Sequence, residues 1–360
     1  MKYLEEMPPR YPINGTLELT LRCNLKCKMC MFRHSDDENT QLLNNELTVE
    51  QWKDIGCQLR NAGTLNLLIT GGEPFLRKDF CEIYGNIYRL GFIITLYTNA
   101  TLVNEQILRT LEQYPPHRIG ITLYGASNET YNTLCGCANG FDKALAGARA
   151  LSKLPSALEF RMTVVHDNLN DADALYKLIK NEFDLPITYT NTVFQSVRGG
   201  CMPVSECRLT PEQNLNMITQ RVASRVRELL PPERKNSIEV RMVDTCEECH
   251  TNSLRYTLLG CSGGMDSYTI TYDGKLLGCQ MLDCFKTDIM ASGFDNAWKE
   301  WPYTVRLPRY NEECSACPHL DLCQVCPGVR MAETGNLQGK PQYICELTKL
   351  LASKKGEILI

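Results

Sequence analysis

The sequence predicts an α/β fold in which six strand–helix units form a partial barrel and a small cysteine-rich α+β domain follows. Two observations predict it. Between residues 15 and 192, short apolar runs alternate with helical segments, and repeated β/α units build a parallel sheet with helices outside it. The chain also has 19 cysteines, many of them in its C-terminal third. We expect a lead segment at 1–14, the barrel at 15–240 and the cysteine-rich domain at 241–360.

Six strand-sized segments form the expected barrel. The first alternates between apolar and polar residues, and the second is a continuous apolar run, as in a buried parallel strand. In chain order the strands are Thr16–Thr20, Leu65–Thr70, Ile93–Thr98, Ile119–Leu123, Phe160–Val165 and Pro186–Thr192. Active sites of such folds lie at the C-terminal ends of the strands, so we expect the site in the loops that follow them.

Helix start and stop signals separate the strands. Thr48 and Gln51 have the spacing of a capping box, and Gly91 closes the second helix. The predicted helices are 48–61, 79–90, 104–112, 141–154 and 172–181. A further polar helix begins at Pro211 and ends near Leu230, ahead of a domain boundary that we expect at 235–245.

Length and composition limit the function. A chain of 360 residues suggests about two domains. The formal net charge of −4 argues against a general nucleic-acid binder, which is usually basic. The first residues lack the apolar core of a signal peptide, and the longest apolar runs are far shorter than a membrane span. We therefore expect a soluble, cytoplasmic protein, in which disulfides are rare and clustered cysteines indicate metal ligands or catalytic thiols.

The first cysteine cluster follows the first strand directly. Cys23, Cys27 and Cys30 have the spacing CX3CX2C. A structural zinc site normally needs four ligands. By contrast, three thiolates on a four-iron cluster leave one iron open to bind and activate a small molecule. On this triplet alone, a zinc half-site and three core cysteines remain alternative interpretations.

Motifs after four successive strands resemble those of the radical S-adenosylmethionine (SAM) superfamily. The cysteine triplet follows the first strand, Gly71-Gly72-Glu73-Pro74 the second and Thr98-Asn99 the third, and Thr122 opens a TLYG segment at the end of the fourth. The resemblance runs from about Leu17 to Thr192. It implies a partial barrel that binds a [4Fe–4S] cluster through the triplet and SAM at the other motifs.

The resemblance also implies roles for single residues. The family's GGEP motif binds the methionine amino group of SAM, and Glu73 can pair with an ammonium. Thr122 would reach the ribose, and Arg161 is a candidate for the carboxylate, although a solvated arginine at a strand end is an equal alternative. The chain departs at Ala100, where glycine is usual. The expected cofactor-binding residues are Met29, Gly71, Gly72, Glu73, Pro74, Thr98, Asn99, Thr122 and Arg161.

Seven ordered cysteines near the C-terminus resemble the SPASM domain, the auxiliary-cluster module of radical SAM enzymes that mostly modify peptides. They are Cys261, Cys279, Cys314, Cys317, Cys323, Cys326 and Cys345. The resemblance implies one auxiliary [4Fe–4S] cluster on Cys314, Cys317, Cys323 and Cys345, and a second on Cys261, Cys279 and Cys326. The fourth ligand of the second is open or is one of Cys246, Cys249 and Cys284. The chain departs by having two residues, not three, before Cys326, and CxxC pairs alone fit two zinc sites equally well.

Two further cysteines follow the fourth strand. Cys135 and Cys137 are close in sequence to the expected SAM site, and either could donate a hydrogen atom to a substrate radical. Buried structural cysteine is the commoner alternative. Cys57 and Cys81 fall on helix faces and are expected in the core, whereas Cys201 and Cys207 have no assigned role.

These resemblances imply an enzyme that cleaves SAM reductively and uses the resulting 5′-deoxyadenosyl radical on a ribosomally synthesised peptide. The product would be a thioether or carbon–carbon cross-link, or an epimer. One alternative is formylglycine formation by a sulfatase maturase, although Gln280 stands where that family usually has an acid. Others are dehydrogenation of a small molecule and a non-catalytic zinc-binding or electron-carrier module.

The expected partners follow from this chemistry. They are a peptide substrate and an external reductant such as flavodoxin or ferredoxin. Only about fifteen residues precede the first strand, so leader recognition would need a separate protein or another surface. We expect no nucleic-acid and no membrane partner.

Overall fold

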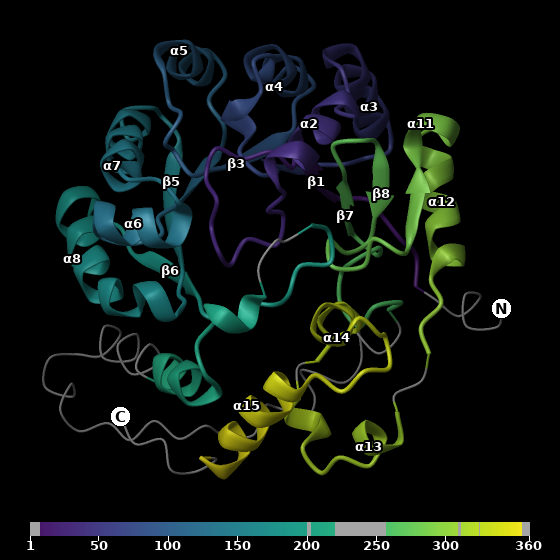
Figure 1. The fold of residues 1–360 in the computed structure, drawn as a ribbon. Coiled ribbons are helices and arrows are strands. Elements are labelled where there is room, and N and C mark those ends of the chain that lie inside the picture. Colours follow the sequence, from purple (N-terminus) through teal and green to yellow (C-terminus); the bar gives the residue numbers. More distant parts are fainter. Residues whose placement is uncertain (1–7, 200–202, 220–256, 309–310, 324, 355–360) are drawn as a thin grey trace, which may run out of the picture.

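The computed structural model describes residues 8–199, 203–219, 257–308, 311–323 and 325–354. They form one sheet with the strand order β6-β5-β4-β3-β2-β1-β7-β8-β9 (Figure 1). The first six strands are β1 Asn14–Glu18, β2 Asn66–Thr70, β3 Ile93–Thr98, β4 Arg118–Thr122, β5 Ala157–Thr163 and β6 Ile187–Thr190. They run parallel, each beside its predecessor in the chain.

Five helices form an arc outside the parallel strands: α3 Val49–Asn61, α4 Phe80–Tyr88, α5 Glu105–Gln113, α7 Gly140–Leu151 and α8 Ala172–Phe183 (Figure 1). Two more, α2 Asp36–Asn44 and α6 Asn128–Cys135, follow β1 and β4, and the last turn of α6 accepts backbone hydrogen bonds from the cysteine loop. Short 3-10 helices lie at η1 Pro74–Leu76, η2 His166–Asp171 and η3 Val204–Glu206, and residues 211–219 are helical. The predicted partial barrel is confirmed.

Two helices of the barrel region, α2 and α6, were not expected from the sequence. Ser35 and Glu38 form a capping box at the start of α2, in the same way that Thr48 and Gln51 do for α3. Ser127 caps α6 by accepting a hydrogen bond from the Thr130 N–H. Both helices are short, so the signal that could have found them was the cap and not a long apolar period.

Burial alternates along the strands and separates a packed side from a barrel side. Leu67 and Ile69 of β2 are buried in the core under the helices, whereas Leu68 and Thr70 are only half-buried. On α3, Trp52, Ile55 and Leu59 recur at helical spacing and are all buried. The core therefore lies between strands and helices, and strand ends such as Thr70 open towards the loops of the site.

The cysteine-rich region continues the barrel sheet. It contains β7 Ser267–Ile270, β8 Lys275–Leu277, β9 Lys286–Asp288, α11 Ile289–Ser292, α12 Phe294–Thr304, α13 Glu312–Ser315, η5 Leu320–Leu322, α14 Pro327–Thr334 and α15 Gln342–Ser353. Strand β7 pairs in parallel with β1, and β8 and β9 follow in antiparallel order. Backbone hydrogen bonds therefore attach this region directly to the strand before the first cysteine cluster.

Two predictions from the sequence concern residues that the structure does not describe. The second half of the polar helix and the boundary at 235–245 lie outside the described residues. In the described part, no helix is both long and apolar enough to cross a membrane.

Candidate active site

The loop after β1 brings Cys23, Cys27 and Cys30 together. Cys27 is buried and the other two thiols are half-buried. The Leu25 N–H donates to Cys23 Sγ over 3.4 Å, and the Phe32 N–H donates to Cys30 Sγ over the same distance. Backbone donors aimed at sulfur stabilise a thiolate, which is the form that binds metal.

The arrangement of the three thiols is compatible with a four-iron cluster. Burial raises the pKa of Cys30 to about 12, and burial also holds the pKa of Cys23 well above its usual range. These thiols keep their protons until a metal displaces them. Within the described residues, no three His, Cys, Asp or Glu side chains converge closely enough to enclose one ion. A four-iron cluster has no such requirement, because each thiolate binds a different iron.

The two glycines after β2 lie against the segment that enters the cysteine loop. The Gly72 N–H donates to the Thr20 carbonyl over 2.7 Å, and the Glu73 N–H donates to that of Arg22 over 2.9 Å. A Cβ on Gly72 would lie 2.6 Å from the Leu21 carbonyl oxygen. This contact explains the need for glycine here, since no side chain fits between the two loops.

Glu73 is completely buried, and its carboxylate accepts hydrogen bonds from three protein groups. The Phe75 N–H donates to Oε1 over 3.1 Å, the Thr98 hydroxyl to Oε1 over 2.8 Å and the Asn99 N–H to Oε2 over 2.8 Å. Burial raises the pKa of Glu73 to about 7, although these hydrogen bonds oppose the shift. The carboxylate therefore joins the end of β2 to that of β3 and lies near its protonation midpoint at neutral pH.

The segment after β3 contacts the cysteine loop as well. The Asn99 side-chain amide donates to Asn24 Oδ1 over 3.1 Å and to Cys23 Sγ over 3.7 Å. Ala100 has φ 58°, in the left-handed region that favours glycine. The usual glycine of the resembled motif thus corresponds to a strained position that this chain fills with alanine.

The remaining expected SAM contacts lie at different depths. Pro74 is buried at the start of η1 and Met29 is buried in the core. Thr122 ends β4 beside Arg161 of β5 in the sheet register. The Arg161 guanidinium lies 4.6 Å above the Tyr97 ring and pairs with Glu159 over 3.0 Å. It therefore faces the barrel side with a carboxylate partner already in place.

The second cysteine region contains two separate groups of thiols. Burial raises the pKa of the Cys345 thiol, and three neighbouring thiols raise it further. These neighbours are Cys323, Cys314 and Cys317. Arg330, which is 1% exposed, donates from Nη1 to Cys314 Sγ over 3.6 Å. Cys345 thus lies near the other three cysteines that the SPASM resemblance places in the same cluster.

The other group contains Cys261, Cys279 and Cys326. Burial raises the pKa of Cys279 to about 11, and the thiols of Cys326 and Cys261 add to the shift. The Gly263 N–H donates to Cys261 Sγ and the Met281 N–H donates to Cys279 Sγ, each over 3.4 Å. The first cysteine loop has the same pattern, in which the donor follows the cysteine by two residues. Of the suggested fourth ligands, Cys284 is exposed, and Cys246 and Cys249 lie outside the described residues.

Comparison with known proteins identifies the N-terminal part of the chain. The profile of the radical SAM superfamily matches residues 17–179. These residues form a radical SAM domain. The match covers the cysteine loop and the loops after β2, β3 and β4. The loops that carry the expected SAM and cluster residues therefore all lie within the matched region.

Two curated relatives come from Methanosarcina barkeri (strain Fusaro / DSM 804). One is named AdoMet-dependent heme synthase; it is 24% identical over 91% of this chain and 94% of its own length. The other is named Fe-coproporphyrin III synthase and is 29% identical over 56% of this chain and 50% of its own length.

Two solved structures share the fold beyond the radical SAM domain. Streptococcus suis SuiB bound to S-adenosylmethionine has a TM-score of 0.68 at 15% identity, covering 96% of this chain and 80% of SuiB. The structure of anSMEcpe with bound AdoMet and Kp18Cys peptide has a TM-score of 0.64 at 16% identity, and the match covers 96% of this chain and 97% of anSMEcpe. The likeness extends over the radical SAM domain and the cysteine-rich region together.

The two cysteines after β4 have different surroundings. Cys135 is fully buried, and its carbonyl accepts a hydrogen bond from the Lys26 N–H over 2.8 Å, next to Cys27 in the cysteine loop. Cys137 is half-buried and reaches Asn139 Oδ1 over 3.9 Å. Cys57 and Cys81 are half-buried, Cys207 is buried, and Cys201 lies outside the described residues.

A buried ion pair on the barrel side was missed by sequence reasoning. Arg198 donates to both oxygens of Glu18 over 2.8 and 2.6 Å, and the Gln280 amide donates to Oε1 over 2.9 Å. The guanidinium lies 4.8 Å above the ring of Phe32, two residues after Cys30. The partners are up to 262 residues apart, so no local pattern could have revealed them.

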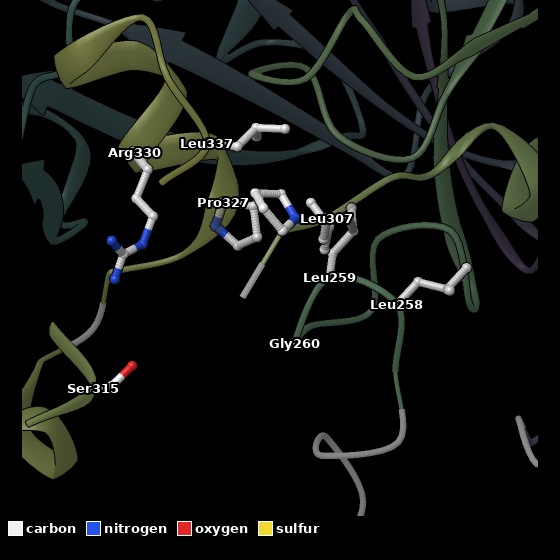
Figure 2. Close-up of a pocket in the computed structure, with 9 residues that line it drawn as sticks. Leu258, Leu259, Gly260, Leu307, Ser315, Pro327, Arg330 and Leu337 are labelled. Carbon is white, nitrogen blue, oxygen red and sulfur yellow. The ribbon is translucent and has the colours of Figure 1, made fainter. Parts of the chain in front are cut away.

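A pocket of about 490 Å³ lies among the segments that carry both groups of auxiliary thiols (Figure 2). Its lining consists of Leu258, Leu259, Gly260, Leu307, Pro308, Ser315, Pro327, Arg330 and Leu337. Gly260 precedes Cys261, and Pro327 follows Cys326. The lining contains no cysteine, so this space is a neighbour of the thiol groups and not a metal site itself.

Proposed function

We propose that this chain is a radical SAM enzyme that oxidises a peptide substrate by hydrogen-atom abstraction, with two auxiliary iron–sulfur clusters that receive the released electron. One observation carries the proposal. The cysteine-rich region gathers two separate groups of thiols, Cys261/Cys279/Cys326 and Cys314/Cys317/Cys323/Cys345, next to the radical SAM domain. Two additional metal centres are not needed for SAM cleavage alone, but they suit a reaction that must remove an electron from the substrate.

The residues of the radical SAM domain have distinct roles in this proposal. SAM and a reduced cluster, when bound, supply a carbon-centred radical that takes a hydrogen atom from the substrate. Cys23, Cys27 and Cys30 hold the cluster, and the Gly71-Gly72 backbone lines the methionine end of SAM. Glu73 binds the ammonium with its remaining acceptor capacity, since an ionised carboxylate has about four acceptor positions and three donors occupy it.

The ion pairs near the first cysteine loop and on the barrel side favour a substrate with few carboxylates. Arg198 pairs with Glu18 over 2.6 Å, Lys28 with Asp167 over 2.6 Å and Arg161 with Glu159 over 3.0 Å. Each of these three cations already has its own anion, so a polyanionic substrate that binds one of them would have to displace that anion. A peptide backbone, which is polar but neutral, fits without that cost.

A second candidate is oxidative decarboxylation of an iron porphyrin. It rests on the relative named AdoMet-dependent heme synthase, which aligns over nearly the whole of both chains. That reaction would also release an electron, and the auxiliary thiols would serve it equally well. Formylglycine formation is less favoured, because Gln280 bonds Glu18 where that family usually has an acid after the cysteine.

The test begins with anaerobic reconstitution. About twelve irons per chain correspond to three four-iron clusters, and Cys345→Ala or Cys279→Ala should each remove about four. Dithionite-driven release of 5′-deoxyadenosine is then compared for the short peptides encoded beside the gene and for Fe-coproporphyrin III. Release stimulated by a peptide, with a mass loss of two hydrogens, supports the proposal. Stimulation by the porphyrin alone would show that the substrate is a porphyrin and not a peptide. About four irons per chain, with zinc in the remaining sites, would show that the auxiliary clusters cannot receive the electron.

A further inference from the structure

A buried arginine contacts one group of auxiliary thiols from a helix that begins at the other group. Arg330 is 1% exposed and belongs to α14, which starts directly after Cys326. Its Nη1 donates to Cys314 Sγ over 3.6 Å and to the Gly339 carbonyl over 2.9 Å. Figure 2 shows the Arg330 side chain extending from α14 towards Ser315, which follows Cys314 in the sequence. A guanidinium therefore lies against the sulfur of an expected cluster ligand, inside the protein.

The start of α14 is packed against the Cys261/Cys279/Cys326 group. The Arg330 N–H donates to the Cys326 carbonyl over 3.1 Å, in the first turn of the helix. A Cβ on Gly328 would lie 3.4 Å from Cys279 Sγ and 3.7 Å from Cys326 Sγ. The position of the guanidinium is thus set by a helix whose first turn rests on two ligands expected for the other auxiliary cluster.

The contact between Arg330 and Cys314 has only one possible direction. A guanidinium is permanently charged in proteins, has five N–H donors and has no acceptor, so it can only donate to sulfur. A cysteine that ligates iron is a thiolate, and a cluster held by thiolates becomes more negative when it is reduced. A buried positive charge attracts that negative charge strongly, because little water is present to screen it.

We propose that Arg330 is a positioning residue that raises the reduction potential of the auxiliary cluster expected on Cys314, Cys317, Cys323 and Cys345. The inference rests on the clusters of the proposed function. In that scheme the substrate radical loses an electron, the oxidised cluster takes it up, and an external one-electron carrier of the flavodoxin or ferredoxin class removes it later. No proton moves at Arg330, which makes the cluster a better electron acceptor through its charge and its hydrogen bond to sulfur.

The experiment is an anaerobic redox titration of the reconstituted full chain, followed by EPR. The signal of this cluster is the one that Cys345→Ala removes. In Arg330→Gln, which keeps an N–H donor but loses the charge, the reduced-to-oxidised ratio at a fixed potential should fall about tenfold, which corresponds to about 59 mV for a one-electron couple. In Arg330→Lys, which keeps the charge, the ratio should fall much less. Equal falls in both variants, or no fall in Arg330→Gln, would overturn the proposal.

Arg208→Gln is the matched control. The Arg208 guanidinium also contacts α14, because it pairs with Glu333 over 2.7 Å, and it lies 3.8 Å from the centre of the Tyr343 ring. Among the hydrogen bonds of the described residues, Arg208 donates to a carboxylate and to no sulfur. This variant should leave the ratio unchanged. A fall as large as that of Arg330→Gln would mean that disturbance of α14 changes the potential, and it would refute the role of the contact with Cys314.

A second neutral variant keeps the test decisive if Arg330→Gln does not load with iron. In Arg330→Met, an unbranched apolar side chain fills the buried space without leaving a polar group there. The proposal requires the same lower ratio in this variant, and a wild-type ratio would refute it. Iron analysis of the wild type separates the two levels of inference. Wild-type protein without iron that depends on Cys345 would refute the proposed function, whereas a bound cluster with the same potential in the neutral variants would refute only the role of Arg330.

Discussion

At the scale of single residues, Glu73 is buried and only partly ionised at neutral pH. Its carboxyl has no exposed surface and a pKa raised to about 7. Because this value lies above the 4.5 of an ordinary glutamate, the folded protein without SAM is favoured when Glu73 is protonated. That contribution to stability is present at low pH and is lost as the pH rises from about 4.5 to about 7.

SAM binding should depend on pH in the opposite sense. The ammonium of SAM needs the ionised carboxylate, so affinity should fall as the pH drops through about 7. Glu73→Gln should bind SAM about tenfold more weakly at pH 8, as expected for the loss of a charge-assisted hydrogen bond of about 1.5 kcal/mol, and its affinity should be nearly flat with pH. Calorimetry of SAM binding between about pH 6 and pH 8 measures both effects. A wild-type affinity that does not change over this range would contradict the role of Glu73.

At the scale of elements, the loops after β1 and β2 can touch only because Gly72 has no side chain. The Cβ of Gly72→Ala would press on the carbonyl oxygens of Leu21 and Arg22, just before Cys23. We expect this substitution to displace the cysteine loop and to lower the iron bound by the first cluster site at least severalfold. Iron analysis and the EPR signal that responds to SAM measure the loss.

A matched glycine provides the control for that prediction. In Gly85→Ala of α4, the new Cβ would lie 3.4 Å from Tyr114, which is an ordinary contact. Helix propensity favours alanine over glycine by about 1 kcal/mol, so this variant should keep its iron and unfold at the same or a higher denaturant concentration. Equal iron loss in both variants would mean that the fold, and not the loop contact, was damaged.

The elements also show what the sequence could predict and why. The loops after β2 and β3 were predictable because their residues act within a few positions of a strand end, and the caps Ser35 and Ser127 carried an overlooked local signal. The hydrogen bonds from the Lys26 and Lys28 N–H groups to the end of α6 were not predictable, since they depend on how α6 packs on a loop about a hundred residues earlier. The grouping of auxiliary thiols came from a family resemblance, because spacing alone fits zinc equally well.

At the scale of the whole molecule, one buried network joins the barrel to the cysteine-rich region. Glu18 ends β1, Arg198 comes from the segment after β6, and Gln280 follows Cys279. Together with the pairing of β1 and β7, this contact links the loop of an expected auxiliary ligand to the strand that leads into the first cluster loop. The pairing of β1 with β7 and the hydrogen bond from Gln280 to Glu18 thus both contribute to how the two regions pack together.

Breaking this ion pair should therefore cost stability. Glu18→Gln leaves the Arg198 guanidinium buried without its charge partner, which typically costs about 3–5 kcal/mol. Glu300→Gln, at an exposed position of α12, should change the free energy of unfolding by less than about 0.5 kcal/mol. Urea unfolding of both variants under anaerobic conditions measures the difference. If Glu18→Gln unfolds like Glu300→Gln, the network around Glu18 does not stabilise the fold, and other contacts between the two regions, such as the pairing of β1 with β7 and the Arg208–Glu333 ion pair, must do so.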